Sequence, residues 1–186
     1  MKTLLLGCLI CSLACFNRTD MKLIDNTPVA HFNLERYLGT WYEIARFPHS
    51  FEKDLVGVTA NYSIRNDGKI RVINAGYKGS LDGTYTTIEG KAKPADTTDS
   101  GHLRVSFFLF FYADYYILEL DTVNYEYALV GSSSPDYLWI LSRRPHIAQE
   151  TFNFLVEKAR ERGYDTQKLI KVEQKPLRKY EEGKTI

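Results

Sequence analysis

Beyond position 15 the sequence contains no cysteine, because Cys8, Cys11 and Cys15 account for all three. The segment from Phe16 onward therefore has no intramolecular disulfide and no thiol nucleophile, and packing and hydrogen bonds must hold its fold. Net charge is nearly absent, formally +1 at pH 7, so no overall basic field favours nucleic acid as a partner. The apolar run near the N-terminus is shorter than the ~20 residues of a membrane-spanning helix.

Patterns that carry catalysis or metal binding are missing as well. The four histidines, His31, His49, His102 and His146, are far apart and lack metal-ligand spacing, so we expect solvated surface residues. Ser132–Ser134 follows a glycine without forming a nucleophile elbow. We therefore expect that the protein binds no metal and no cofactor and is not an enzyme. Paired catalytic acids are not recognisable in a single sequence, so a lipid-modifying enzyme stays as an alternative.

What the sequence has in abundance is aromatic residues, with 13 Tyr and 10 Phe, which favour strands and line apolar cavities. Residues 56–65 alternate apolar and polar side chains, as a half-buried strand does. Asn66-Asp67-Gly68 then predicts a hairpin turn, because these residues tolerate positive φ. Eight strand-like segments without an intervening helix favour an antiparallel sandwich or barrel. The segments are Thr40–Phe47, Val56–Arg65, Lys69–Tyr77, Thr84–Lys93, Leu103–Tyr112, Tyr115–Asp121, Tyr125–Gly131 and Tyr137–Arg143.

Helical patterns occur at the two ends of this series. Asn33–Gly39 predicts a short helical turn that Asn33 caps. Ala148–Arg162 predicts an amphipathic helix, because apolar residues recur at i, i+3, i+4 and i+7, and Lys168–Val172 suits a short strand. The sequence thus predicts an all-β fold, an eight-stranded antiparallel up-and-down barrel with one C-terminal helix packed outside. The apolar stripe of that helix comprises Phe152, Leu155, Val156 and Ala159.

The N-terminus has the character of an export signal, with Lys2, a short apolar run and a small residue, Ala14, before Cys15. Leu13-Ala14-Cys15 resembles the end of a bacterial lipoprotein signal, in which cleavage precedes a cysteine that is then acylated. An ordinary cleaved signal without an anchor is the alternative, since Ser12 fits that pattern imperfectly. We expect a signal peptide over residues 1–14, lipidation at Cys15, a tether over 15–31 and a charged tail over 175–186.

Three stretches resemble the signature regions of the lipocalin family. Gly39 and Trp41 open the first, where a Gly-x-Trp follows a short helix. Arg143 ends the third, and the resemblance implies that it lies across the Trp at the closed end, a contact worth about 0.5–2 kcal/mol. The likeness is strongest to the branch with bacterial outer-membrane lipoproteins and apolipoprotein D, and it implies a domain over residues 32–174. The stretches are Gly39–Arg46, Asp121–Tyr125 with Ala128–Val130, and Leu138–Arg143.

The resemblance implies a hydrophobic ligand inside the barrel. With Trp41 and Arg143 pointing inward, alternation places the side chains two, four and six positions away on the same wall. Comparison with apolipoprotein D implies that Tyr62 and Phe107 also face the cavity. The alternative is a solid core, since eight-stranded barrels are sometimes filled by their own side chains. The expected ligand-binding residues are Phe47, Val58, Ala60, Tyr62, Asn74, Phe107, Leu109 and Trp139.

The family further implies a carrier of a fatty acid or lysophospholipid at the outer membrane, lipid-anchored and on the periplasmic side. A steroid, a bilin or a haem-like pigment is the alternative cargo. Alternation also places Phe108, Phe110 and Tyr112 on the outside of the barrel. Such an aromatic patch suits contact with the bilayer, a homodimer or cover by a neighbouring loop, and the sequence leaves these open.

Overall fold

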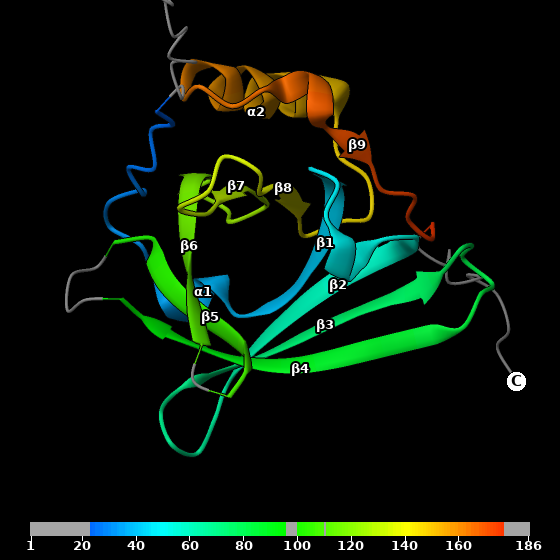
Figure 1. Ribbon diagram of the computed structural model, residues 1–186. Coiled ribbons are helices and arrows are strands. Elements are labelled where there is room, and N and C mark those ends of the chain that lie inside the picture. The colour runs from blue at the N-terminus through cyan, green and yellow to red at the C-terminus, as the bar shows by residue number, and fades with distance from the viewer. Residues whose placement is uncertain (1–22, 96–99, 110, 177–186) are drawn as a thin grey trace, which may run out of the picture.

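The computed structural model describes residues 23–95, 100–109 and 111–176. Eight antiparallel strands pair in the order β2-β3-β4-β5-β6-β7-β8-β1, and pairing of β1 with β2 closes the barrel (Figure 1). Helix α2 lies across the outside, which confirms the predicted fold class. The elements are α1 Leu34–Tyr37, β1 Gly39–Arg46, β2 Leu55–Ile64, β3 Ile70–Lys78, β4 Tyr85–Pro94, β5 His102–Phe108, β6 Phe111–Leu120, β7 Tyr127–Gly131, β8 Leu138–Ser142, α2 Gln149–Glu161 and β9 Ile170–Lys171.

The apolar stretch 103–112 contains a hairpin that the sequence did not reveal. β5 ends at Phe108, Leu109 lies in the turn with a φ of 42°, and Phe111 of β6 pairs back onto Phe108. The prediction of one continuous strand with Leu109 facing the interior is therefore wrong. Glycine, proline and asparagine, which usually mark a turn, are all missing from this stretch. The side chain of Phe110 lies outside the described residues.

A β-bulge in β1 reverses the faces of its second half. The register of β1 on β8 shifts between Glu43 and Ala45, so that Arg46 turns to the interior while Ala45 turns outward. Phe47 follows on the outer side, where its ring centroid lies 6.2 Å from that of Tyr164. The expectation that Phe47 lines the interior is therefore wrong, because one extra residue inverts the alternation that follows it.

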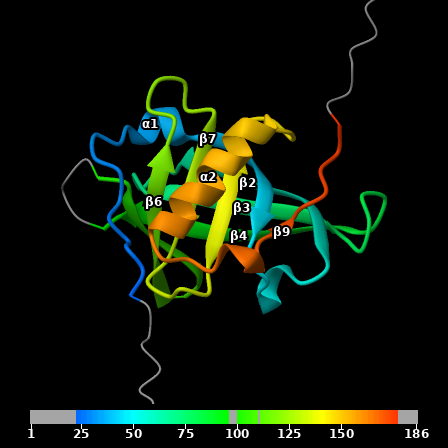
Figure 2. The same ribbon diagram turned by 90° about the horizontal axis from the view of Figure 1, so that it is seen from above.

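Two apolar cores lie on opposite sides of the barrel wall. The interior core contains Tyr37, Trp41 and Tyr62 together with apolar residues from the surrounding strands. The outer core packs α2 onto the barrel, with Leu155 and Ala159 fully buried. All four residues of the predicted helical stripe belong to this outer core, and α2 crosses the barrel as Figure 2 shows. Burying a leucine stabilises by about 1.5–3 kcal/mol, so this contact fixes the helix in place.

Residues 170–174 complete the barrel where β1 and β2 separate. β1 pairs with β2 only as far as Tyr42, and beyond that point β9 pairs with β1. The Gly57 amide of β2 donates to the Glu173 carbonyl at 2.6 Å. The buried Gln174 amide nitrogen donates to the carbonyls of Glu43 and Val58, one on each strand. This segment therefore supplies the backbone partners that β1 and β2 no longer give each other.

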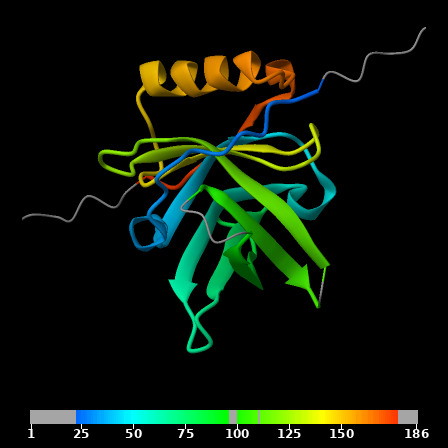
Figure 3. The same ribbon diagram turned by 90° about the vertical axis from the view of Figure 1, so that its left-hand side faces the viewer.

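The N-terminal segment runs along the barrel from α2 to the closed end. Its first described residues lie beside α2, as Figures 1 and 3 show, and the Asp25 amide donates to the Arg162 carbonyl at 2.8 Å. Farther on, the Val29 amide donates to the Ile117 carbonyl of β6 at 2.9 Å. The segment ends in α1, which Asn33 caps as predicted by accepting from the Arg36 amide.

Gly131 at the end of β7 is expected to tolerate no side chain. A Cβ there would lie 2.3 Å from the Tyr164 hydroxyl oxygen and 2.9 Å from a Leu118 methyl carbon. Gly131→Ala should therefore cost about 1–3 kcal/mol of unfolding free energy through overpacking. Tyr164→Phe removes the clashing oxygen together with its hydrogen bond to Asn26. In urea unfolding the double variant should lose less than the two single losses combined; additive losses would show that the clash is not the cause.

Candidate ligand-binding interior of the barrel

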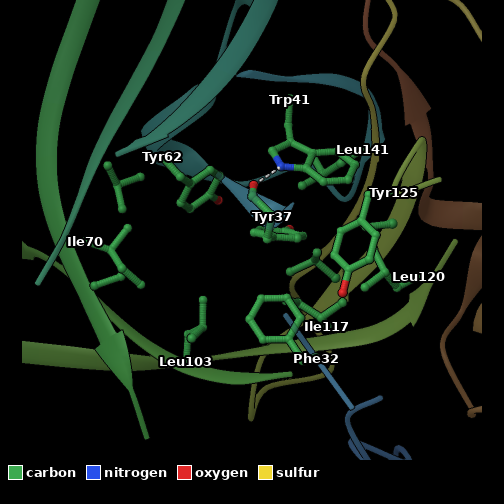
Figure 4. Close-up of a cluster of buried hydrophobic side chains, with 14 residues drawn as sticks. Phe32, Tyr37, Trp41, Tyr62, Ile70, Leu103, Ile117, Leu120, Tyr125 and Leu141 are labelled. Atoms are coloured by element: carbon green, nitrogen blue, oxygen red, sulfur yellow. Dashed lines mark hydrogen bonds between the residues drawn. The ribbon is translucent and has the colours of Figure 1, made fainter. Parts of the chain in front are cut away.

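A guanidinium group and an indole ring close one end of the barrel. The Arg143 Cζ atom lies 3.9 Å from the centroid of the Trp41 ring, and its guanidinium donates to three backbone carbonyls at 2.7 to 3.2 Å. Gly39, beside the guanidinium, has a φ of 93°, a backbone conformation that favours glycine. The Trp41 indole nitrogen donates to the Tyr37 carbonyl at 2.8 Å, the dashed line in Figure 4.

Three tyrosine hydroxyls meet inside the barrel above this closed end. The Tyr115 oxygen lies 2.8 Å from that of Tyr37 and 3.0 Å from that of Tyr62. Figure 4 shows Tyr37 and Tyr62 among the inward-facing side chains. Burial raises the pKa of Tyr62 to about 12 and holds the pKa values of Tyr37 and Tyr115 well above the usual 10. All three therefore stay neutral at physiological pH and act as both donors and acceptors.

The opposite end carries a buried group of charges that we call the mouth cluster: Glu43, Arg46 and Glu52. Arg46 is the last residue of β1, and Glu52 lies in the β1–β2 loop with its side chain buried. Arg46 Nη1 donates to Glu43 Oε1 at 2.6 Å, and Nη2 donates to the backbone carbonyls of Glu52 and Leu55 at 2.8 and 3.2 Å. The guanidinium therefore holds the loop against the strand.

The mouth cluster has two carboxylates for one guanidinium. Burial and the negative charge of Glu52 raise the pKa of Glu43 well above its usual value, while Arg46 opposes the shift. Arg46 Nε lies 3.9 Å from Glu52 Oε2 and has no hydrogen-bond partner among the described residues. The cluster is thus a polar site with donor capacity left over, in an otherwise apolar interior.

Aromatic rings surround the mouth cluster on the loop side. The His49 imidazole stacks on Phe51 at 3.8 Å between centroids, and Trp139 stacks with Tyr137 at 5.9 Å. The Trp139 indole nitrogen donates to Glu52 Oε2 at 3.3 Å. His49 Nε2 lies 2.9 Å from the same oxygen with its side chain buried, so the expectation that His49 is solvated is wrong.

The wall formed by β2 to β5 is only partly covered by other side chains. Ala60, Val105 and Phe107 are half-buried and pack against the interior core. Asn74 pairs with Ala60 across the β2–β3 ladder, and its Oδ1 atom is buried without a hydrogen-bond partner in the described structure. Ile88, which pairs with Asn74, is 44% exposed. Apolar surface and one unused acceptor therefore face the inside of the barrel.

The structure brings together six of the eight residues predicted to bind ligand. They come from four strands, β2, β3, β5 and β8, and all lie on the interior side or line its wall. Phe47 and Leu109 do not join them, for the reasons given above. The six are Val58, Ala60, Tyr62, Asn74, Phe107 and Trp139.

Several residues of the interior were not predicted from the sequence. Arg46 was missed because strict alternation places it outside, and only the bulge turns it inward. Glu52 carries no local signal, since its partners Arg46 and Trp139 come from two different strands. Tyr115 lies in a segment that is apolar on both faces, so alternation does not orient it.

Within the described residues no group of three or more His, Cys, Asp and Glu side chains is arranged to hold a metal ion. None of the described helices combines the length and the apolar character needed to cross a bilayer.

The geometry above agrees with the comparisons with known proteins. A family model described as a lipocalin-like domain matches residues 32–174. The chain belongs to the lipocalin family. This lipocalin is 47% identical over 147 residues to the outer membrane lipoprotein Blc of Vibrio cholerae. The aligned region covers 79% of this chain and 85% of that protein. It is 42% identical to temperature-induced lipocalin-1 of Arabidopsis thaliana, covering 78% of this chain and 81% of that protein.

Solved structures agree at the level of the fold. Insecticyanin of the tobacco hornworm Manduca sexta superposes on this lipocalin with a TM-score of 0.67, covering 81% of this chain and 85% of that one, at 22% identity. Lobster apocrustacyanin A1 gives a TM-score of 0.59 at 24% identity, covering 77% and 80%. These likenesses support the barrel and its external helix and leave the ligand to the chemistry of the interior.

Proposed function

We propose that this lipocalin binds a single amphiphilic lipid, a fatty acid or a lysophospholipid, in its barrel and catalyses no reaction. The observation that carries the proposal is the partly uncovered aromatic wall, with Phe107 and Trp139 half-buried, beside a buried polar cluster at the mouth. An apolar surface with a few convergent polar groups is the usual composition of a site for a small hydrophobic molecule. Such a ligand places its chain on the wall and its polar end at the mouth.

Two polar atoms of the barrel interior, one in the mouth cluster and one on the wall, suit a headgroup with both donors and acceptors. Arg46 Nε has unused donor capacity, and Asn74 Oδ1 is an acceptor without a partner in the described residues. A carboxylate or phosphate would accept from Arg46 when Glu43 is protonated, the state that its raised pKa favours, and a hydroxyl, as on the glycerol of a lysophospholipid, would donate to Asn74. Burial of the acyl chain supplies roughly 25 cal/mol per Å² of apolar area before the costs of binding.

For the location we propose the periplasmic side of the outer membrane, through acylation of Cys15. The support is the lipoprotein-like end of the N-terminal signal and a 47% identical relative named as an outer membrane lipoprotein. Residues 1–14, Cys15 and the tail beyond Pro176 lie outside the described residues. Transport, storage or repair of membrane lipid is the role that this location supports.

Titration of the delipidated chain, lacking residues 1–15, with lysophospholipid and fatty acid under native mass spectrometry tests the proposal. We expect saturable one-to-one binding. Trp139→Ala should weaken it at least tenfold, or about 1.4 kcal/mol, because the indole contributes both apolar wall and the hydrogen bond to Glu52.

Val123→Ala, at an exposed position in the β6–β7 turn, is the matched control and should bind normally. Absence of binding by a folded chain would contradict the proposal and point to a filled barrel or another cargo. A coloured preparation from the native host would favour a bilin or haem-like pigment over a colourless lipid. Turnover that survives purification and disappears with Trp139→Ala would instead support a lipid-modifying enzyme.

A further inference from the structure

The β5–β6 hairpin ends in an exposed apolar surface that we call the hairpin tip: Phe108, Leu109 and Phe111. These side chains are 72%, 74% and 82% exposed. Leu109 also adopts the left-handed backbone region, with a φ of 42°, which is unfavourable for a residue with a side chain. Adjacent exposed apolar residues at a strained turn are typical of a surface that meets a partner.

Basic side chains surround the hairpin tip. The Tyr112 ring, next to Phe111, has Lys91 Nζ, Lys93 Nζ and Arg104 Cζ at 5.7, 5.1 and 5.9 Å from its centroid. A hollow of about 330 Å³ beside the tip is lined by Phe108 and Leu109 together with Lys91 and Arg65.

The carboxylates on this side are engaged with basic partners. Glu89 accepts from Arg71 at 2.6 Å, and Asp114 lies 3.1 Å from His102 and 3.8 Å from Arg104. Asp67 accepts from Arg65 at 3.1 Å. Six lysines and arginines against three carboxylates leave this part of the described surface with a positive excess. The six are Arg65, Lys69, Arg71, Lys91, Lys93 and Arg104.

We propose that the hairpin tip docks on a lipid bilayer that carries anionic headgroups. Phe108, Leu109 and Phe111 enter the headgroup region, and the surrounding lysines and arginines contact the lipid phosphates. The positive charge around the hairpin tip favours an anionic bilayer, rather than a second copy of the chain, as the partner of this surface. A symmetric dimer through this surface would bring the same basic side chains of both copies together, whereas anionic lipid complements them.

The docking surface is separate from the N-terminal end of the described chain. Figures 1 and 3 show the first described residues beside α2, on the opposite side of the barrel from the β5–β6 hairpin. The hairpin tip is therefore a surface distinct from the one along which the described N-terminal segment runs. Phe107, the neighbour of the tip, packs against the interior core, so the docked hairpin connects the bilayer surface to the barrel wall.

The fluorescence of a tryptophan introduced into the hairpin tip would report docking directly. Leu109→Trp in the full chain should show a blue-shifted emission, relative to the unsubstituted chain, when vesicles containing phosphatidylglycerol are added. Brominated lipids in those vesicles should quench it. The same reporter at the exposed β6–β7 turn, Val123→Trp, is the matched control and should neither shift nor be quenched.

Charge reversal tests the electrostatic half of the proposal. Lys93→Glu combined with Arg104→Glu in the Leu109→Trp chain should lower the affinity for vesicles about tenfold or more. Added salt should likewise lower the vesicle affinity of the Leu109→Trp chain without the charge reversals. Arg160→Glu on α2, an exposed arginine paired with Glu157, reverses one charge on the opposite side and should have little effect. Phe108→Ser with Phe111→Ser should abolish the emission shift.

Three results would overturn the proposal: an equal shift on purely phosphatidylcholine vesicles, no shift on any vesicle, or a shift that rises with protein concentration in the absence of lipid. The last would assign the tip to a second copy of the chain. Trp139→Ala separates docking from ligand binding, because it should leave the emission shift of the reporter unchanged while lowering the affinity of the barrel for its lipid ligand.

Discussion

Arg46→Leu should destabilise the barrel by about 3–5 kcal/mol at neutral pH, the usual loss when one partner of a buried ion pair is removed. The change leaves Glu43 and Glu52 buried together without a compensating cation. It also removes the donors to the backbone carbonyls of Glu52 and Leu55, which hold the β1–β2 loop. Urea unfolding followed by tryptophan fluorescence measures the loss.

The loss in Arg46→Leu should depend on pH in a defined direction. Burial and Glu52 already raise the pKa of Glu43 in the folded state. A carboxyl with a raised folded pKa favours folding fully below its unfolded pKa of about 4.3, and that contribution disappears as pH rises through the folded pKa. Arg46 opposes the shift, so its removal widens this window. The destabilisation should therefore be larger at pH 8 than at pH 5.

Two further variants make the result on Arg46 specific. Glu43→Gln in the Arg46→Leu background should recover part of the stability at pH 8, because a neutral amide keeps the shape and removes a buried charge. Arg65→Leu removes an exposed arginine bonded to Asp67 and should cost less than about 1 kcal/mol. Equal losses for Arg46→Leu at both pH values would contradict the assignment.

The second large effect is expected at the closed end of the barrel. Arg143→Met should cost about 3 kcal/mol, because it removes the cation–π contact with Trp41 and a charged donor from three carbonyls. Arg143→Lys should retain only part of the unfolding free energy that Arg143→Met loses, because an ammonium group lacks the planar fork that reaches several acceptors at once. The acceptors are the backbone carbonyls of Arg36, Thr40 and Tyr125.

The adjacent Arg144 provides the control for the closed end. Its side chain is exposed and lies 3.5 Å from Glu126, so Arg144→Met should change the unfolding free energy by less than about 1 kcal/mol. Ligand affinity should be nearly unchanged in Arg143→Met at temperatures where the chain stays folded, because the mouth lies at the other end. Similar losses of stability for Arg143→Met and Arg144→Met would contradict the role of Arg143.

The sequence predicted what periodicity and local turn chemistry determine. The alternation in residues 58–64, the Asn66-Asp67-Gly68 turn and the apolar stripe of α2 have a single consistent interpretation each, and the structure confirms them. The turn at Leu109 was missed because apolar residues surround it and no turn residue marks it. Hairpin contacts across the two strands, rather than local preference, determine its place.

The interior was predictable only where alternation is unbroken. Tyr62 and Trp139 follow from it, whereas the bulge after Glu43 exchanges the faces of Arg46 and Phe47. A bulge is an extra residue in the pairing with a neighbouring strand, so one strand read alone does not reveal it. Glu52 reaches the interior through contacts with residues that are distant along the chain, which a local pattern does not encode.

The segment 170–174 has a consequence for the order of folding. β1 obtains its backbone partners from β2, β8 and β9, so the first strand along the chain is complete only when this last segment has joined it. Contacts of such long sequence separation make folding slow and late. The backbone pairing of β1 is therefore complete only after synthesis has passed residue 174, which makes the closing of this part of the barrel a late step in folding.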